Sequence, residues 1–106
     1  LQVLQTVRDT GGSGTAVSDQ QIIDAIRLLA ETEGIFTEPA GGTTLAGTID
    51  LIQRGVIAPN ESVVVCVTGN GYKTAEVMNG QLVEPVRLSR AFKEFEAWWD
   101  SRQAIA

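Results

Sequence analysis

The chain has 106 residues, of which eight are Lys or Arg, thirteen are Asp or Glu and none is His, so its formal net charge is −5. This length suits one small domain spanning residues 1–106. A composition of 43% hydrophobic and 20% charged residues is typical of a folded chain. The negative charge argues against nucleic acid or an anionic membrane as a partner. The lack of histidine excludes His-dependent catalytic triads and most catalytic zinc sites, and we expect no metal site.

The single cysteine, Cys66, excludes an internal disulfide and indicates a reducing compartment. We therefore expect a cytoplasmic location, with a plastid as the alternative. No apolar run approaches the ~20 residues that span a bilayer, and we expect neither a membrane span nor a signal peptide. The sequence starts at Leu1 without an initiator Met, as expected for a piece of a longer protein.

The clearest predicted element is a helix at 19–33. It follows a glycine- and serine-rich run at 11–14 that predicts a loop. Ser18 and Gln21 have the spacing of a capping box, and the apolar residues that follow recur at helical spacing. Gly34 suits the left-handed position that ends a helix.

Two strands are predicted at 35–38 and 63–67, separated by a helix at 42–54 that Gly55 ends. The second strand has five consecutive apolar residues, four of them β-branched, which is typical of a strand buried on both faces. Cys66 within it is expected in the core. We therefore expect an α/β fold in which a βαβ unit, with a right-handed crossover, forms a short parallel sheet flanked by helices.

The candidate ligand site lies at the carboxyl ends of these strands. Parallel strands place those ends on one edge of the sheet, where α/β proteins bind ligands. The segments 38–42 and 68–71 should therefore meet. The Thr68 hydroxyl, followed by glycines, suits the close approach of a flat or anionic ligand, although an ordinary turn explains the pattern about equally well. The glycines of 38–42 could present free helix N–H groups to an anion or could serve close packing.

The C-terminal part carries an aromatic helix. Asn79-Gly80 predicts a tight turn, and a hairpin arm is expected through 82–88. Ser89 suits the N-cap of a last helix whose aromatic residues at 92–99 form a stripe. Because this stripe and Phe36 have no partner surface, we expect a dimer or higher homo-oligomer.

Two blocks of the sequence, 16–47, which contains ETEGIFTEPAGGTTLAG, and 61–73, ESVVVCVTGNGYK, resemble threonine synthase. That family consists of pyridoxal-phosphate-dependent enzymes with the tryptophan-synthase-β fold (fold type II). The order and spacing of the blocks match the C-terminal part of the family, and the resemblance covers residues 1–80. It implies a piece of the large domain of such an enzyme, with 81–106 as a tail.

The resemblance implies conversion of O-phospho-L-homoserine and water to L-threonine and phosphate, as carried out by a carbon–oxygen lyase. Pyridoxal phosphate supplies the electron sink. In such enzymes the residue matching Thr68 places its hydroxyl on the pyridine nitrogen, Gly69 lets the ring approach the backbone, and Asn70 completes the turn. The pocket lining implied next to them is Glu38, Ala40 and Gly41.

The Schiff-base lysine, the asparagine near the ring oxygen and the glycine-rich phosphate loop of the family all precede the position that matches Leu1. We therefore expect no catalytic residue in this chain, and Lys73 is not a candidate. The isolated chain should be inactive and should not retain pyridoxal phosphate, and the rest of the same polypeptide is its expected partner. Two alternatives remain. One is a fragment of a serine/threonine ammonia-lyase, where Ser-Gly-Asn-Gly is commoner than the Thr-Gly-Asn-Gly at 68–71, and the other is a non-catalytic binding or assembly module.

Overall fold

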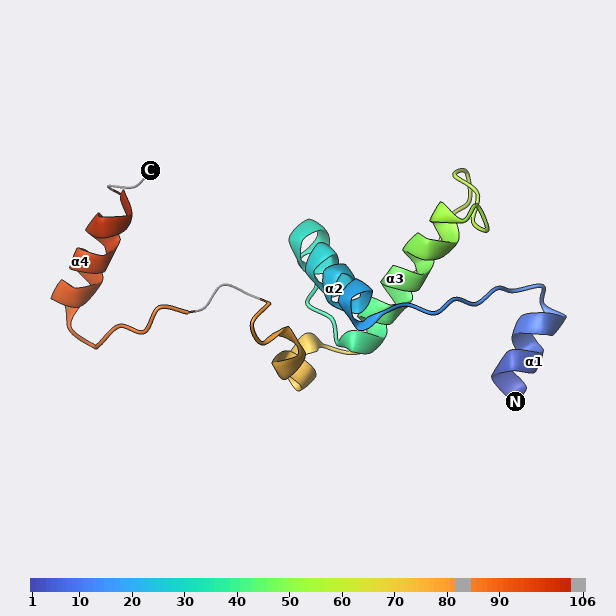
Figure 1. Ribbon diagram of the computed structural model, residues 1–106, viewed down its shortest axis with the longest axis horizontal. Coiled ribbons are helices and arrows are strands. Elements are labelled where there is room, and N and C mark those ends of the chain that lie inside the picture. The colour runs from blue at the N-terminus through green and yellow to red at the C-terminus, as the bar shows by residue number, and fades with distance from the viewer. Residues whose placement is uncertain (82–84, 104–106) are drawn as a thin grey trace.

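A computed structural model describes residues 1–81 and 85–103. The element order is α1 (Gln2–Asp9), α2 (Asp19–Glu33), α3 (Pro39–Gln53), the 3-10 helix η1 (Gly71–Met78) and α4 (Phe92–Gln103). The molecule is elongated, with principal extents of 65 × 29 × 20 Å, and α1 and α4 lie at opposite ends of a central α2–α3 pair (Figure 1). Within the described ranges, none of these helices is long and apolar enough to cross a bilayer.

Helix α2 has the boundaries that the sequence predicts because both of its ends are capped. Ser18 Oγ accepts a hydrogen bond from the N–H of Gln21 (3.3 Å), and Gln21 Oε1 accepts one from the N–H of Ser18 (2.8 Å). At the other end Gly34 has a φ of +68°, and its N–H donates to the carbonyl of Ala30. The predicted capping box and C-cap are both confirmed.

Helix α3 begins at Pro39, three residues before the predicted start at 42. Proline suits the first helical position, because its missing N–H would find no partner within the helix there. The helix ends at Gln53, and Gly55 follows it with a φ of +70°, as the sequence predicts.

The packing of α2 against α3 forms the core of the molecule. Ala25, Ile26 and Leu29 of α2 are buried, as is Ala46 of α3. The helices approach closely at Gly42, where an added Cβ would lie 2.7 Å from Ile26 Cγ1. A side chain at this position would force the two helices apart.

The predicted βαβ unit and its parallel sheet are wrong, because the residues that the structure describes contain no strand. Residues 35–38 contribute a single antiparallel bridge, between Thr37 and Asn70. Residues 63–67 lie outside any helix or strand, and Cys66 is exposed instead of packed in the core. A sheet needs backbone hydrogen bonds between neighbouring strands, and no described residue makes them with 63–67. The described fold is therefore helical, not α/β.

The N-terminal part differs from the sequence prediction by one helix. Helix α1 lies where no element was predicted, and none of its residues is buried. The predicted loop at 11–14 is confirmed, since Gly11 has a φ of +67° and residues 12–18 lie outside any helix or strand.

The C-terminal part agrees with its prediction at two points. The tight turn at Asn79-Gly80 is present, because Gly80 has a φ of +71° and the N–H of Gln81 donates to the carbonyl of Met78 (3.0 Å). Of the predicted hairpin, residues 82–84 lie outside the described part and 85–88 form no strand. The aromatic helix α4 is confirmed, but it starts at Phe92, so Ser89 is not its N-cap as predicted. Ser89 Oγ instead accepts a hydrogen bond from the N–H of Ala91 (3.2 Å), before the helix begins.

Candidate functional site

The two segments that the sequence predicts to meet lie together, but in an antiparallel contact and not at the edge of a parallel sheet. The N–H of Glu38 donates to the carbonyl of Gly69 (3.1 Å), and the N–H of Gly71 donates to the carbonyl of Phe36 (3.0 Å). The Thr37 hydroxyl, which is buried, donates to the same Gly69 carbonyl (3.2 Å). These three bonds hold the loop 68–71 against residues 36–38.

Two glycines lie beside this contact, and glycine is required at residue 41, where an added Cβ would meet the buried Thr37 side chain. A Cβ on Gly69 would overlap the carboxylate of Glu38, and a Cβ on Gly41 would overlap the hydroxyl of Thr37. The space that a side chain at residue 69 would need is therefore filled by Glu38. The sequence predicts that the two segments meet, but it carries no signal that the Glu38 side chain lies over Gly69.

The predicted site residues differ in what their side chains do. Thr68 is exposed, and its hydroxyl has no hydrogen-bond partner among the described residues. The side-chain oxygen of Asn70 accepts a hydrogen bond from the N–H of Tyr72 (2.9 Å) and so caps η1. Ala40 is exposed and Gly41 is buried. Thr68 therefore has its whole hydroxyl available to a ligand, whereas the side-chain oxygen of Asn70 is engaged.

The glycines at the start of α3 serve packing in this structure. The N–H groups of Gly41 and Gly42 both donate to the carbonyl of Glu38, at 3.0 and 3.2 Å. Both glycines are buried. Their N–H groups are therefore engaged within the helix and are not free to bind an anion.

An aromatic pair beside the loop was not among the predicted site residues. The rings of Phe36 and Tyr72 meet edge to face, with centroids 5.3 Å apart and an interplanar angle of 83°. Together with Ile26, Arg27 and other residues, they line a pocket of about 340 Å³ between α2 and η1. The only signal for this pair in the sequence is the position of Tyr72 directly after the Thr-Gly-Asn-Gly run.

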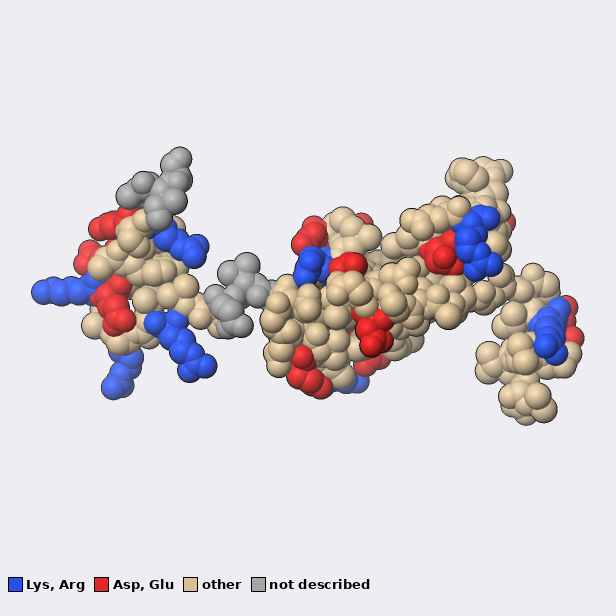
Figure 2. Space-filling model, viewed as in Figure 1, with Lys and Arg blue, Asp and Glu red and all other residues tan. Residues whose placement is uncertain are grey.

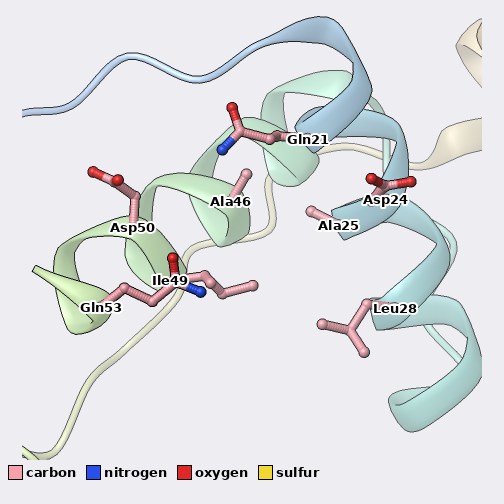
Figure 3. A pocket seen from close by; sticks show the side chains of 8 residues that line it. All are labelled: Gln21, Asp24, Ala25, Leu28, Ala46, Ile49, Asp50 and Gln53. Atoms are coloured by element: carbon pink, nitrogen blue, oxygen red, sulfur yellow. The ribbon is translucent and has the colours of Figure 1, made fainter.

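A second hollow, an open groove of about 230 Å³, lies between α2 and α3 (Figure 3). Leu28 and Ile49 point toward one another across it. Asp50 lines this groove. The pKa of its carboxyl is lowered below the ordinary value, mainly by the hydrogen bond from the Thr15 hydroxyl and to a smaller extent by the hydrogen bond from Arg54. None of the predicted site residues lines this groove. Among residues 1–81 and 85–103, no cluster of His, Cys, Asp or Glu could hold a metal ion.

The model of the pyridoxal-phosphate-dependent enzyme family matches residues 1–69 of this chain. The threonine synthase of Methanocaldococcus jannaschii is 36% identical over 82% of this chain and 22% of its own length. The threonine synthase of Bacillus sp. (strain ULM1) is 40% identical over 70% of this chain and 21% of its own length. That of Mycobacterium tuberculosis is 39% identical over 66% of this chain and 19% of its own length.

These relatives confirm the resemblance to threonine synthase that the two sequence blocks indicate. The chain spans about a fifth of the length of these relatives. Pyridoxal phosphate is the cofactor of the parent enzyme to which this chain corresponds. Because the family model covers well over half of its residues, the chain belongs to the pyridoxal-phosphate-dependent enzymes.

Proposed function

We propose that this chain forms the pyridine-nitrogen side of the cofactor pocket in a threonine synthase, which converts O-phospho-L-homoserine and water to L-threonine and phosphate. The observation that carries the proposal is the loop 68–71, which is held by backbone hydrogen bonds while the Thr68 hydroxyl stays exposed. The names of the relatives support the choice of reaction.

The chemistry of the loop fits the proposed role. The Thr68 hydroxyl can donate one hydrogen bond to the ring nitrogen of pyridoxal phosphate, and, unlike a carboxylate, it does not hold that nitrogen protonated. Bound pyridoxal phosphate supplies the electron sink for elimination and replacement on the substrate. The N–H of Glu38 and the hydroxyl of Thr37 both donate to the Gly69 carbonyl, which restrains the peptide group between Gly69 and Asn70. This restraint fixes the backbone next to Thr68 before the cofactor arrives.

The isolated chain is proposed to be inactive and not to retain the cofactor. Its lysines, Lys73 and Lys93, are both exposed, whereas a Schiff-base lysine works in an enclosed site that excludes water. The lysine that holds the cofactor is proposed to belong to the rest of the polypeptide.

A chimera tests the role of Thr68. This chain replaces the matching C-terminal part of the Bacillus relative, and phosphate release from O-phosphohomoserine is measured together with the absorbance of the bound cofactor. We expect Thr68→Val to lower activity about tenfold or more, the effect of losing one aimed hydrogen bond, and to shift the absorbance. Thr43→Val is the matched control, because the Thr43 hydroxyl bonds to the carbonyl of Pro39 in α3 and to no other residue that the structure describes.

Two results would contradict the proposal. In the active chimera, an unchanged rate and absorbance with Thr68→Val would remove Thr68 from the cofactor site. In the isolated chain, a saturable absorbance change on titration with pyridoxal phosphate that disappears with Lys73→Arg would show that this chain carries a functional lysine.

A further inference from the structure

The sequence contains two Asn-Gly pairs, Asn70-Gly71 and Asn79-Gly80. An asparagine followed by glycine can lose its side-chain amide without an enzyme, because glycine has no side chain to hinder attack by its backbone nitrogen. That nitrogen must reach the asparagine Cγ, so the peptide that joins the pair has to rotate. The two asparagines start from nearly the same ψ, 137° and 130°. The reactivity of each pair therefore depends on what holds its peptide in place.

The Asn70-Gly71 peptide is held by hydrogen bonds at both of its polar groups. The N–H of Gly71 donates to the carbonyl of Phe36 (3.0 Å), and the carbonyl of Asn70 accepts from the N–H of Lys73 (3.3 Å). The side-chain oxygen of Asn70 also accepts from the N–H of Tyr72 (2.9 Å). Gly71 is buried. Rotation of this peptide and attack on the side chain would therefore break three hydrogen bonds.

The Asn79-Gly80 peptide is free to rotate. It is the central peptide of a turn that the N–H of Gln81 closes on the carbonyl of Met78 (3.0 Å). With Asn79 at φ −59° and ψ 130° and Gly80 at φ +71°, this is a type II turn. Type I and type II turns differ in the orientation of that peptide and share the closing hydrogen bond. The N–H of Gly80 bonds to no residue that the structure describes, and Asn79 is exposed.

We propose that Asn79 is a site of spontaneous deamidation, whereas the hydrogen bonds around Asn70 protect it. The nitrogen of Gly80 bonds to Cγ of Asn79 and gives up its proton, and ammonia leaves, which closes a succinimide ring. Water then opens the ring at either carbonyl and gives isoaspartate or aspartate. Water is the only co-reactant, and the net change replaces an amide with a carboxylate. This inference does not depend on the proposed role of Thr68.

Isoaspartate at residue 79 changes how the following segment is held. It adds one carbon to the main chain inside the turn, so the hydrogen bond between Gln81 and Met78 loses its geometry. The carbonyl of the same Gln81 accepts a hydrogen bond from the guanidinium of Arg27 (2.8 Å), which ties this segment to α2. We therefore expect the isoaspartyl chain to release Gln81 from α2.

Incubation of the chain at mildly alkaline pH, with samples taken over time, tests the proposal. Trypsin cuts after Lys73, so Asn70 and Asn79 fall in different peptides, 55–73 and 74–87. Mass spectrometry measures the gain in mass from amide to acid, and electron-transfer fragmentation locates it and distinguishes isoaspartate from aspartate. We expect Asn79 to convert about tenfold or more faster than Asn70, because the hydrogen bonds that hold Asn70 must break first. Isoaspartate should be among the products.

The same incubation in urea is the matched control, because unfolding removes the hydrogen bonds of both pairs, and there the two rates should be similar. Asn79→Gln should stop the reaction in 74–87, since glutamine would have to form a larger ring. Equal rates in the folded chain overturn the proposal, as does aspartate without isoaspartate. A difference in rate that persists in urea overturns the protection of Asn70 by the fold.

Hydrogen exchange at the N–H of Gln81 tests the effect on the turn. It should be faster in the isoaspartyl chain than in Asn79→Asp, which carries the same charge without the extra main-chain carbon. Equal exchange in the two chains would overturn the release of Gln81.

Discussion

Asp50 connects two parts of the sequence that lie 35 residues apart. Its carboxylate accepts a hydrogen bond from the hydroxyl of Thr15 and forms an ion pair with Arg54 on the next turn of α3 (3.1 Å). The bond from Thr15 is the largest cause of the lowered pKa of Asp50, followed by the bond from Arg54. A lowered pKa in the folded state means that ionised Asp50 stabilises the fold above the ordinary carboxyl pKa. This contribution is lost as the pH falls through the lowered value.

We therefore expect Thr15→Val to raise the pKa of Asp50 toward its ordinary value, with the contact to Arg54 remaining. A pH titration of the Asp50 side-chain carbon by NMR measures this shift directly. Thr44→Val serves as the control, because the Thr44 hydroxyl bonds to the carbonyl of Ala40 within α3. An Asp50 pKa that does not change with Thr15→Val would show that the Thr15 contact has no effect on the carboxyl in solution.

At the scale of single elements, α2 was predicted correctly and the strands were not, for a physical reason. The caps of α2 lie within three or four residues of the atoms that they satisfy, so a short window of sequence contains them. The run at 63–67 has the composition of a buried strand, but a strand also needs a neighbour. Residues 35–38 form one bridge, to Asn70 of the loop 68–71, and do not pair with 63–67.

The packing of α2 on α3 depends on Gly42, and this can be tested by adding one methyl group. An added Cβ would lie 2.7 Å from Ile26 and 2.8 Å from the carbonyl oxygen of Ile22. We expect Gly42→Ala to lower the free energy of unfolding by about 1–3 kcal/mol through overpacking, measured by urea denaturation. Gly14→Ala is the control, because nothing lies within 4 Å of its Cβ position. Equal stability of the two variants would mean that the helices do not pack as closely as described.

On the scale of the whole molecule, the two ends of the chain project from a central helix pair (Figure 1). The aromatic rings of α4 pack among themselves, with Phe95 and Trp99 centroids 6.1 Å apart, and Arg102 lies over the ring of Trp98. Phe92 is nevertheless 69% exposed. Lys and Arg side chains extend from this end of the molecule on several sides (Figure 2). The expected homo-oligomer stays a prediction.

This arrangement predicts the order of cleavage by trypsin. Arg87 and Arg90 are exposed and lie outside any helix or strand, so the chain should be cut after them first. Arg27 is half-buried within α2, and its guanidinium donates to the carbonyl of Gln81 (2.8 Å), so cleavage there should be much slower. Mass spectrometry of a time course measures the order. Cleavage after Arg27 as early as after Arg87 would contradict the stability of the central pair.

The amino-acid sequence alone was enough to identify α2, the turn at Asn79-Gly80 and the family. These features depend on residues that are close together in the chain or on motifs that the sequence carries intact. The cofactor role of Thr68 follows from the family resemblance and stays a prediction.

Three-dimensional structure was needed to show that 63–67 joins no sheet, that Glu38 fills the space beside Gly69 and that Thr15 reaches Asp50. In each case the residues whose contact matters are tens of positions apart in the sequence. Whether such residues meet depends on which surfaces the folded chain brings together, and local sequence patterns carry little information about that.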